Sequence, residues 1–161
     1  YAESVQIIIG LENPAEGHDQ IIDSGRTGAA VVRQIGSDFV KLNYDFGNAY
    51  TYSQGKLIPA CDYREALPYA CHLHLKDLKK SINGWDFTWI GNGIIDYDAI
   101  FQELVEAEKL LPMSIEHLFI FAASEHFSVH RLGQPPALSQ ISTSLKNSFD
   151  YVNAALTAPH R

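Results

Sequence analysis

Four side chains that can bind a divalent metal stand at the ends of short apolar segments of the sequence. Successive side chains of a strand point to opposite faces, so a strand can bury one face and still end in a polar group on the other. The four polar ends are Glu12, Asp45, His74 and Glu116. Carboxylates with one imidazole suit Mn²⁺, Mg²⁺, Co²⁺ or Zn²⁺ rather than a thiolate-binding metal. The set predicts a metal site if the four side chains converge.

The segments that must position these side chains read as strands alternating with helices. Strands are predicted over residues 5–12, 39–45, 70–75 and 113–119, and helices over 20–35, 97–110 and 139–156. Asp96 or Asp98 can cap the helix that starts near residue 97, and Pro112 closes it. This alternation predicts the α/β class with right-handed βαβ units and a parallel sheet.

The apolar faces of the four strands should be covered by helices. They are formed by Ile7, Ile9 and Leu11; by Val40, Leu42 and Tyr44; by Cys71, Leu73 and Leu75; and by Met113 and Ile115. The four candidate ligands are separated by 33, 29 and 42 residues, about one βα unit of an eight-unit barrel. Active sites of such barrels lie at the carboxyl ends of the strands, so we expect the ligands to converge there.

Composition excludes several classes of function. The formal net charge of -7 and the lack of a Lys/Arg block argue against a nucleic-acid partner. Cys61 and Cys71 fit no disulfide framework and no zinc spacing, which indicates a reducing, cytoplasmic location. No apolar run approaches the roughly 18 residues of a membrane span, so we expect no membrane partner.

Five motifs in order resemble the sugar phosphate isomerase/epimerase family of xylose-isomerase-like TIM barrels. They are LENPAEG at 11–17, NYDFGNAY at 43–50, HLHLKD at 72–77, IGNGIIDYDAIFQEL at 90–104 and MSIEH at 113–117. Each motif is weak alone, but five at barrel spacing form a fairly specific signal. The resemblance covers almost the whole chain and corresponds to the second half of the barrel, strands five to eight.

The resemblance implies a site and a reaction. Glu12, Asp45, His74 and Glu116 would hold one divalent metal ion, and Glu12 and Glu116 would also serve as the acid/base pair. The reaction implied is proton transfer next to the carbonyl of a sugar or sugar phosphate through an enediolate, which makes the protein an isomerase or epimerase.

Other positions are expected to support the site. His72 lies one layer below His74, where it either orients a ligand or is purely structural. Some family members carry a substrate histidine and a substrate arginine where this chain has Asn48 and Lys80, so these two residues are expected to meet a different substrate. Lys76 is expected to be a solvated charge at the rim.

A half barrel over residues 1–161, as a single domain, would leave two exposed strand edges. We therefore expect it to need the missing half of the barrel or a second copy of the chain. Three alternatives stay open: a polyol dehydratase of the same superfamily, a metal-dependent repair enzyme similar to endonuclease IV, and a half barrel that binds without catalysis. The net charge of -7 opposes the second.

Overall fold

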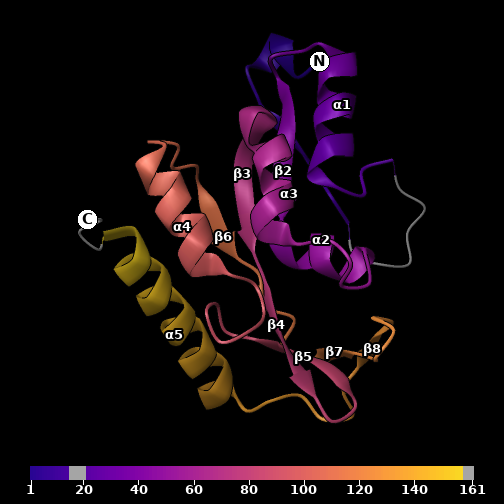
Figure 1. Cartoon of the computed structure of the whole chain (residues 1–161), viewed down its shortest axis with the longest axis vertical. Coiled ribbons are helices and arrows are strands. Elements are labelled where there is room, and N and C mark those ends of the chain that lie inside the picture. The colour runs from indigo at the N-terminus through magenta and orange to yellow at the C-terminus, as the bar shows by residue number, and fades with distance from the viewer. Residues whose placement is uncertain (15–20, 158–161) are drawn as a thin grey trace. The chain divides into compact units, whose positions relative to one another are not determined.

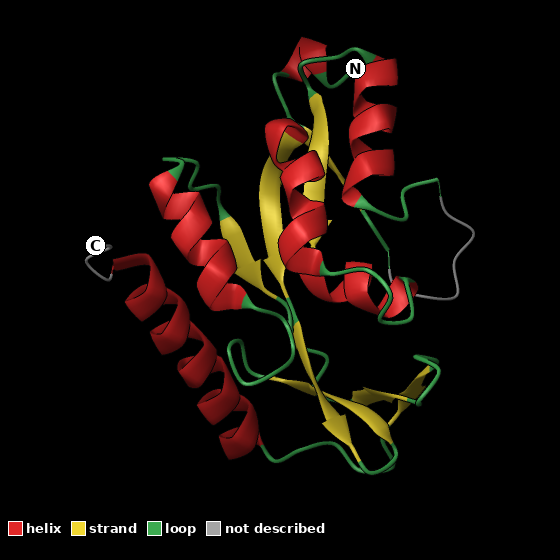
Figure 2. Cartoon of the chain, in the orientation of Figure 1, coloured by secondary structure: helices red, strands yellow, loops and turns green. Residues whose placement is uncertain are grey.

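The chain folds into two compact units. The computed structural model describes residues 1–14 and 21–157. The first unit comprises Tyr1–His74 and Leu111–Ser114, and the second comprises Leu75–Leu110 and Ile115–Arg161. Figures 1 and 2 give the elements of each unit. Residues 15–17 of the first motif and Gln20, where the first helix was expected to begin, lie outside the described residues.

A parallel sheet forms the centre of the first unit and confirms the predicted α/β class. Its strand order is β1-β2-β3-β6, and both β1 with β2 and β2 with β3 pair in parallel. The strands are β1 (Ile9–Glu12), β2 (Val40–Asp45), β3 (Ala70–Leu75) and β6 (Met113–Ile115). The predicted bounds of β3 are confirmed, and β2 differs by one residue.

The first and last predicted strands are shorter than expected. The backbone of Glu3–Val5 forms the 3-10 helix η1, and Gln6 is left-handed with a φ of 54°, so β1 can start only after this turn. Residues 117–121 turn back on themselves through hydrogen bonds from Phe119 N–H to the His117 carbonyl and from Phe121 N–H to the Leu118 carbonyl. This turn ends β6 at Ile115 rather than at residue 119.

In the described part of the first unit, three helices accompany the sheet. They are α1 (Gly25–Ile35), α2 (Phe46–Tyr52) and α3 (Pro59–Ala66), which is followed by the 3-10 turn η2 (Leu67–Tyr69). A reciprocal capping box of Ser24 and Thr27 starts α1, and the left-handed Gly36 ends it. Helices α1 and α3 pack against each other and against β2 (Figure 1).

The expectation of helix-covered strand faces holds for the inner strands and is wrong for the edge. Leu42, Tyr44 and Leu73 are buried, as predicted. Ile7 and Ile9 are about half exposed, at 58% and 46%. The physical reason is that β1 is the outermost strand, while the helices α1 and α3 pack over β2.

The second unit holds an antiparallel sheet that the sequence reading did not anticipate. Its order is β4-β5-β7-β8, with β4 (Asp77–Ser81), β5 (Gly84–Thr88), β7 (Phe121–Ala123) and β8 (Val129–Arg131). Strands β4 and β5 form a hairpin in a stretch where no strand was predicted.

Two helices complete the second unit. They are α4 (Tyr97–Glu106) and α5 (Leu138–Thr157), which lie side by side (Figure 2). Asp96 caps α4 as predicted, by accepting the Ala99 N–H at 3.1 Å. The helix ends at Glu106, before Pro112, because Glu108 adopts a left-handed backbone with a φ of 52°. Among residues 1–14 and 21–157, none of the helices has both the length and the apolarity that crossing a membrane requires.

Candidate metal centre

Three of the predicted ligands meet at the carboxyl ends of the three parallel strands in the first unit. His74 Nδ1 lies 3.0 Å from Glu12 Oε1 and 3.9 Å from Asp45 Oδ2. Glu12, Asp45 and His74 each offer one ligand atom, and these three atoms lie within 4.8 Å of one another. The parallel register explains the meeting, because Asp45 is paired with His74 across β2 and β3 and Glu12 ends the neighbouring β1. Two carboxylates and an imidazole suit a divalent cation.

Asp45 is the most rigidly held member of this group. Its side chain is fully buried, and its Oδ1 accepts the Asn48 N–H at 2.7 Å, which caps the first turn of α2. Asn13 adds a reciprocal pair: its Nδ2 donates to the Asp45 carbonyl at 2.9 Å, and its Oδ1 accepts the Asp45 N–H at 2.8 Å. Asp45 thus presents one oxygen to His74 with its backbone fixed on both sides.

Two asparagines contact the other two predicted ligands. The Asn48 side-chain amide donates to the Asn13 carbonyl at 3.0 Å and reaches Glu12 Oε1 at 3.4 Å. Asn43 Nδ2 lies 3.2 Å from Nδ1 and 3.1 Å from Nε2 of His74. Sequence reasoning missed Asn13 and Asn43. The alternation of strand faces could have found Asn43, because it lies two residues before Asp45 and therefore shares its face.

His72 lies beside His74 on β3, with ring centroids 5.5 Å apart and the rings perpendicular. Its Nε2 lies 2.8 Å from Ser114 Oγ on β6. Partial burial lowers the pKa of His72, and the charge of His74 lowers it further. A neutral His72 tethered to Ser114 is compatible with either role that the sequence left open.

Glu116 and Lys80, the remaining predicted site residues, belong to the second unit. Glu116 directly follows β6; its N–H donates to the Leu75 carbonyl at 2.9 Å, and its Oε1 lies 3.0 Å from Lys76 Nζ. The expectation that Lys76 is a solvated rim charge is wrong, because the residue is only 3% exposed. Lys80 lies on the hairpin with its Nζ 4.8 Å from the Trp85 ring centroid, in a cation–π contact.

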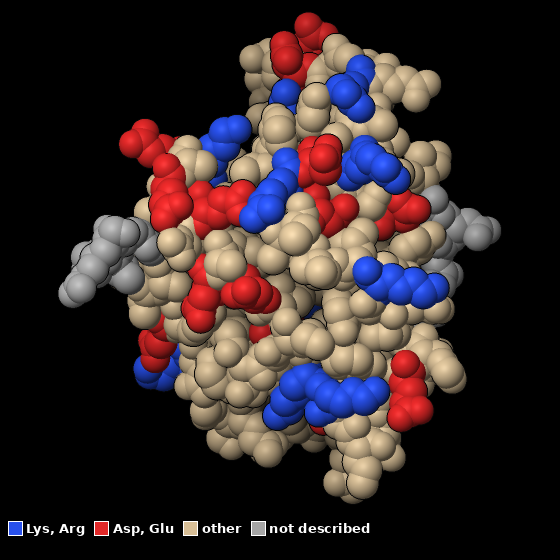
Figure 3. Space-filling model, in the orientation of Figure 1, with Lys and Arg blue, Asp and Glu red and all other residues tan. Residues whose placement is uncertain are grey.

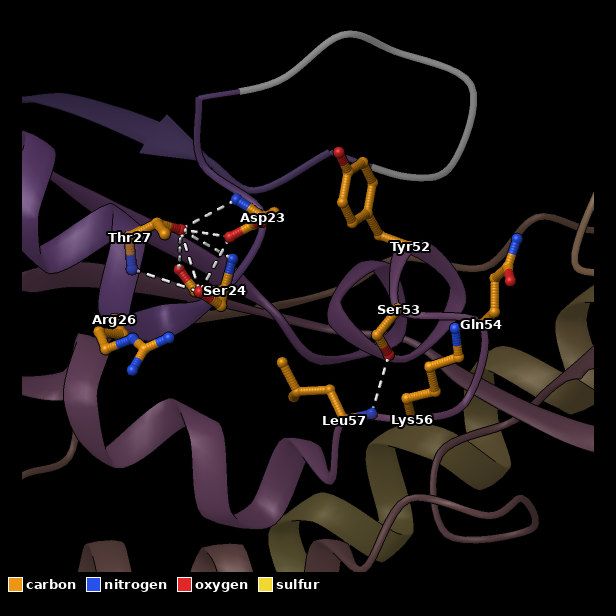
Figure 4. Close-up of a pocket in the computed structure, with 9 residues that line it drawn as sticks. All are labelled: Asp23, Ser24, Arg26, Thr27, Tyr52, Ser53, Gln54, Lys56 and Leu57. Carbon is orange, nitrogen blue, oxygen red and sulfur yellow. Dashed lines mark hydrogen bonds between the residues drawn. The ribbon is translucent and has the colours of Figure 1, made fainter.

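A separate groove of about 550 Å³ lies in the first unit, between the start of α1 and the segment after α2 (Figure 4). The residues that line it are mostly of polar types and include none of the predicted ligands: Asp23, Ser24, Arg26, Thr27, Tyr52, Ser53, Gln54, Lys56 and Leu57. The hydroxyls of Ser24 and Thr27 are engaged with Asp23 and with each other. On the face shown in Figure 3, basic side chains lie singly or in small groups among acidic ones.

Comparison with known proteins identifies the family of the chain. The family model described as "Xylose isomerase-like TIM barrel" matches residues 1–118. The chain belongs to this family. No curated protein has a sequence that matches the chain.

This xylose isomerase-like chain aligns with about half of each solved structure of similar fold. D-psicose 3-epimerase from Clostridium cellulolyticum H10 matches with a TM-score of 0.72 at 17% identity, over 98% of this chain and 52% of the epimerase. A xylose isomerase-like TIM barrel protein from Mycobacterium smegmatis in complex with magnesium matches with a TM-score of 0.67 at 19% identity, over 97% and 47%.

A more distant match is the probable 3-DHS dehydratase AsbF from Bacillus anthracis, with a TM-score of 0.55 at 17% identity, over 71% of this chain and 44% of the dehydratase. The chain therefore spans about half the length of the solved structures it matches. The parallel strand-helix units of the xylose isomerase-like chain correspond to half of a TIM barrel, as predicted.

Proposed function

We propose that this chain carries the metal-binding half of a divalent-metal-dependent isomerase or epimerase that acts on a sugar or sugar phosphate. The observation that supports this most directly is the cluster of Glu12, Asp45 and His74, whose ligand atoms lie within 4.8 Å of one another. Glu116 is proposed as the fourth ligand, and the two compact units are proposed to act together as one half-barrel domain. Mn²⁺, Mg²⁺, Co²⁺ and Zn²⁺ all suit such a donor set.

The reaction requires a proton to leave a carbon next to a carbonyl and to return. A bound divalent ion would supply the Lewis acidity that polarises the carbonyl. Glu12 and Glu116 are proposed to exchange the proton: one carboxylate accepts it from the carbon, and the other donates one to the opposite face or to the neighbouring carbon. Return to the opposite face gives an epimer, and return to the neighbouring carbon gives an isomer.

The remaining residues have supporting roles in this proposal. Asn48, which reaches Glu12 Oε1 at 3.4 Å, would orient that carboxylate toward substrate. His72 and Lys80 are proposed to contact substrate hydroxyl or phosphate groups. The site would be completed by a further half barrel or by a second copy of the chain, in a cytoplasmic protein that needs no nucleic acid.

Metal binding tests the proposal directly. We expect the chain to bind one Mn²⁺, measured by calorimetry and by the loss of the free-ion electron paramagnetic resonance signal. His74→Ala removes a donor atom, and Asp45→Asn replaces a charged carboxylate oxygen with a neutral amide oxygen, so each should weaken binding by at least about tenfold. His130→Ala is the matched control, because this exposed histidine lies on β8 of the other unit. Equal Mn²⁺ binding by His74→Ala and His130→Ala would contradict the proposed site.

Proton exchange tests the chemistry. With D-fructose or D-tagatose as probe and Mn²⁺ present, deuterium from solvent should enter the carbon next to the carbonyl, as followed by NMR. Glu116→Gln should abolish the exchange in protein that is still folded, although the loss of the ion pair with Lys76 lowers its stability. Undiminished exchange in this variant would remove Glu116 from the mechanism.

A dehydratase is the second candidate, and the similarity to the dehydratase from Bacillus anthracis favours it. Both reactions begin with loss of the same kind of proton, but a dehydratase also releases water and leaves a conjugated carbonyl product. Ultraviolet absorbance that rises in step with deuterium incorporation, when a cyclic polyol ketone is the probe, would favour the dehydratase.

A further inference from the structure

Lys76 and Glu116 form an ion pair whose two members differ sharply in exposure. Lys76 Nζ lies 3.0 Å from Glu116 Oε1. The lysine side chain is 4% exposed, whereas the glutamate side chain is 36% exposed. Both residues belong to the second unit, so the pair is a feature of one compact body.

The backbone on both sides of the pair is fixed. The N–H of Lys76 donates to the hydroxyl of Tyr97 at 2.9 Å, and that hydroxyl donates to the Lys76 carbonyl at 2.9 Å. Tyr97 is itself 1% exposed and stacks on Phe101 at the start of α4. Glu116 is held through its N–H, which donates to the Leu75 carbonyl at 2.9 Å. The short ion pair is therefore built into the fold.

The two charges differ in how much their stability in the folded protein relies on the ion pair. The buried Lys76 ammonium relies on it more than the partly exposed Glu116 carboxylate does. An ammonium group withdrawn from water is costly unless a negative charge or hydrogen-bond acceptors replace its hydration. A carboxylate that is one-third exposed keeps part of its hydration. The proposed metal ligand Glu116 is thus also a structural counter-ion.

We propose that Lys76 is a positioning residue that holds the Glu116 carboxylate and weakens its hold on a divalent cation. This inference rests on the proposed function, because it concerns Glu116 as a ligand. The ammonium and a divalent cation attract the same carboxylate, and like charges brought to one carboxylate repel each other. When no metal is bound, the lysine keeps the Glu116 carboxylate in the ion pair. When a metal binds, the same lysine lowers the affinity of the site for it.

The first test is a double-mutant cycle on stability in metal-free protein, measured by urea unfolding. Glu116→Gln should lower the folding equilibrium constant by at least about tenfold, because it leaves a buried ammonium without this partner. In the background of Lys76→Met, the same substitution should change that constant less than about threefold. Equal losses in both backgrounds would overturn the structural dependence.

The second test is Mn²⁺ affinity, which a purely structural lysine would not alter in this way. Lys76→Met should bind Mn²⁺ at least about tenfold more tightly than wild type, and this gain should vanish when Glu116→Gln is added. Lys76→Arg keeps the charge and should restore affinity close to that of wild type. Lys79→Met, an exposed lysine on β4, is the matched control and should leave affinity unchanged.

The outcomes separate this inference from the proposed function. Unchanged or weaker Mn²⁺ binding by Lys76→Met, in a chain whose wild type binds the metal, overturns the role of Lys76 alone. Absence of Mn²⁺ binding in wild type and in every variant overturns the proposed metal centre. It also overturns the proposed effect of Lys76 on metal affinity. The stability cycle still decides independently whether Lys76 and Glu116 are coupled.

Discussion

Two aspartates, Asp62 and Asp77, have carboxyl groups whose pKa burial raises, yet they distribute their hydrogen bonds differently. Asp62 accepts both the Gly25 N–H at 2.6 Å and the Tyr44 hydroxyl at 2.8 Å on the same oxygen, Oδ2. Asp77 accepts four backbone N–H groups, two on each oxygen. This difference decides how well each position tolerates substitution of the aspartate by asparagine, whose amide has one acceptor oxygen and one NH₂ donor.

Asp62→Asn should be tolerated at neutral pH, because one amide oxygen can accept both hydrogen bonds. The raised pKa means that wild-type Asp62 contributes most stability below its unfolded pKa of about 3.9 and loses this contribution as pH rises through the folded pKa. The variant lacks this loss. Its stability relative to wild type should therefore rise with pH from about 4 and then level off, as measured by urea unfolding between pH 3.5 and 7. A variant that is less stable throughout would contradict this prediction.

Asp77→Asn should instead destabilise the second unit by about 2 to 6 kcal/mol. An amide NH₂ in place of either oxygen faces two backbone N–H donors and leaves them unpaired, at about 1 to 3 kcal/mol for each group. One of the two donor pairs is Leu78 N–H with Ile95 N–H, and the other is Gly91 N–H with Gly93 N–H. Urea unfolding at pH 7 checks the value. A loss as small as that of Asp62→Asn would show that the four bonds contribute little.

The sequence could predict that the side chains of Glu12, Asp45 and His74 meet at the strand ends, but not the residues that hold them in place. Asp45 and His74 follow from strand alternation, and the structure brings them together with Glu12 in the first unit. Asn13 stands in an Asn-Pro turn that carries no periodic signal, and its partner Asp45 is 32 residues away, so only the fold reveals the contact. Lys76 was misread because a lysine next to an aspartate is usually solvated, and its burial depends on long-range packing.

At the scale of elements, the parallel strand-helix units were predictable because each has a clear apolar face. The hairpin of β4 and β5 was missed although its signal was present: Asn83-Gly84 between strand-forming residues is typical of a hairpin turn. Gly84 has a φ of 132°, which other residues rarely adopt. The two strands that flank this turn carry charged residues and lack the apolar runs from which the other strands were predicted.

Helix α1 packs so closely on α3 that Gly25 has no room for a side chain. A Cβ there would lie 2.3 Å from the Asp62 carbonyl oxygen and 3.2 Å from the Ala66 amide nitrogen. Gly25→Ala should therefore force the two helices apart and cost about 1 to 3 kcal/mol, although alanine favours helix formation. Chemical unfolding measures the loss. Gly133→Ala is the matched control, because a Cβ at Gly133 meets nothing within 4 Å. Equal stability of the two variants would refute the close contact.

At the scale of the whole molecule, strand β1 forms one of the two edges of the parallel sheet. Strand β1 ends the order β1-β2-β3-β6, and among residues 1–14 and 21–157 no strand pairs with its outer side. The side chains that lead into this edge are exposed: Ile7 at 58%, Ile8 at 54% and Ile9 at 46%. Exposed apolar edge strands are templates for pairing with another chain.

We expect this edge to drive self-association of the chain. Ile8→Lys places a charge at the edge and should lower the weight-average mass in sedimentation experiments at high protein concentration, with a change in unfolding free energy below about 1 kcal/mol. Ile82→Lys is the matched control, since Ile82 is 94% exposed in the turn between β4 and β5 and the substitution adds the same charge. If charge alone governs association, both variants will dissociate alike. If the edge governs it, only Ile8→Lys will, because only that lysine must be desolvated when a second strand pairs with β1.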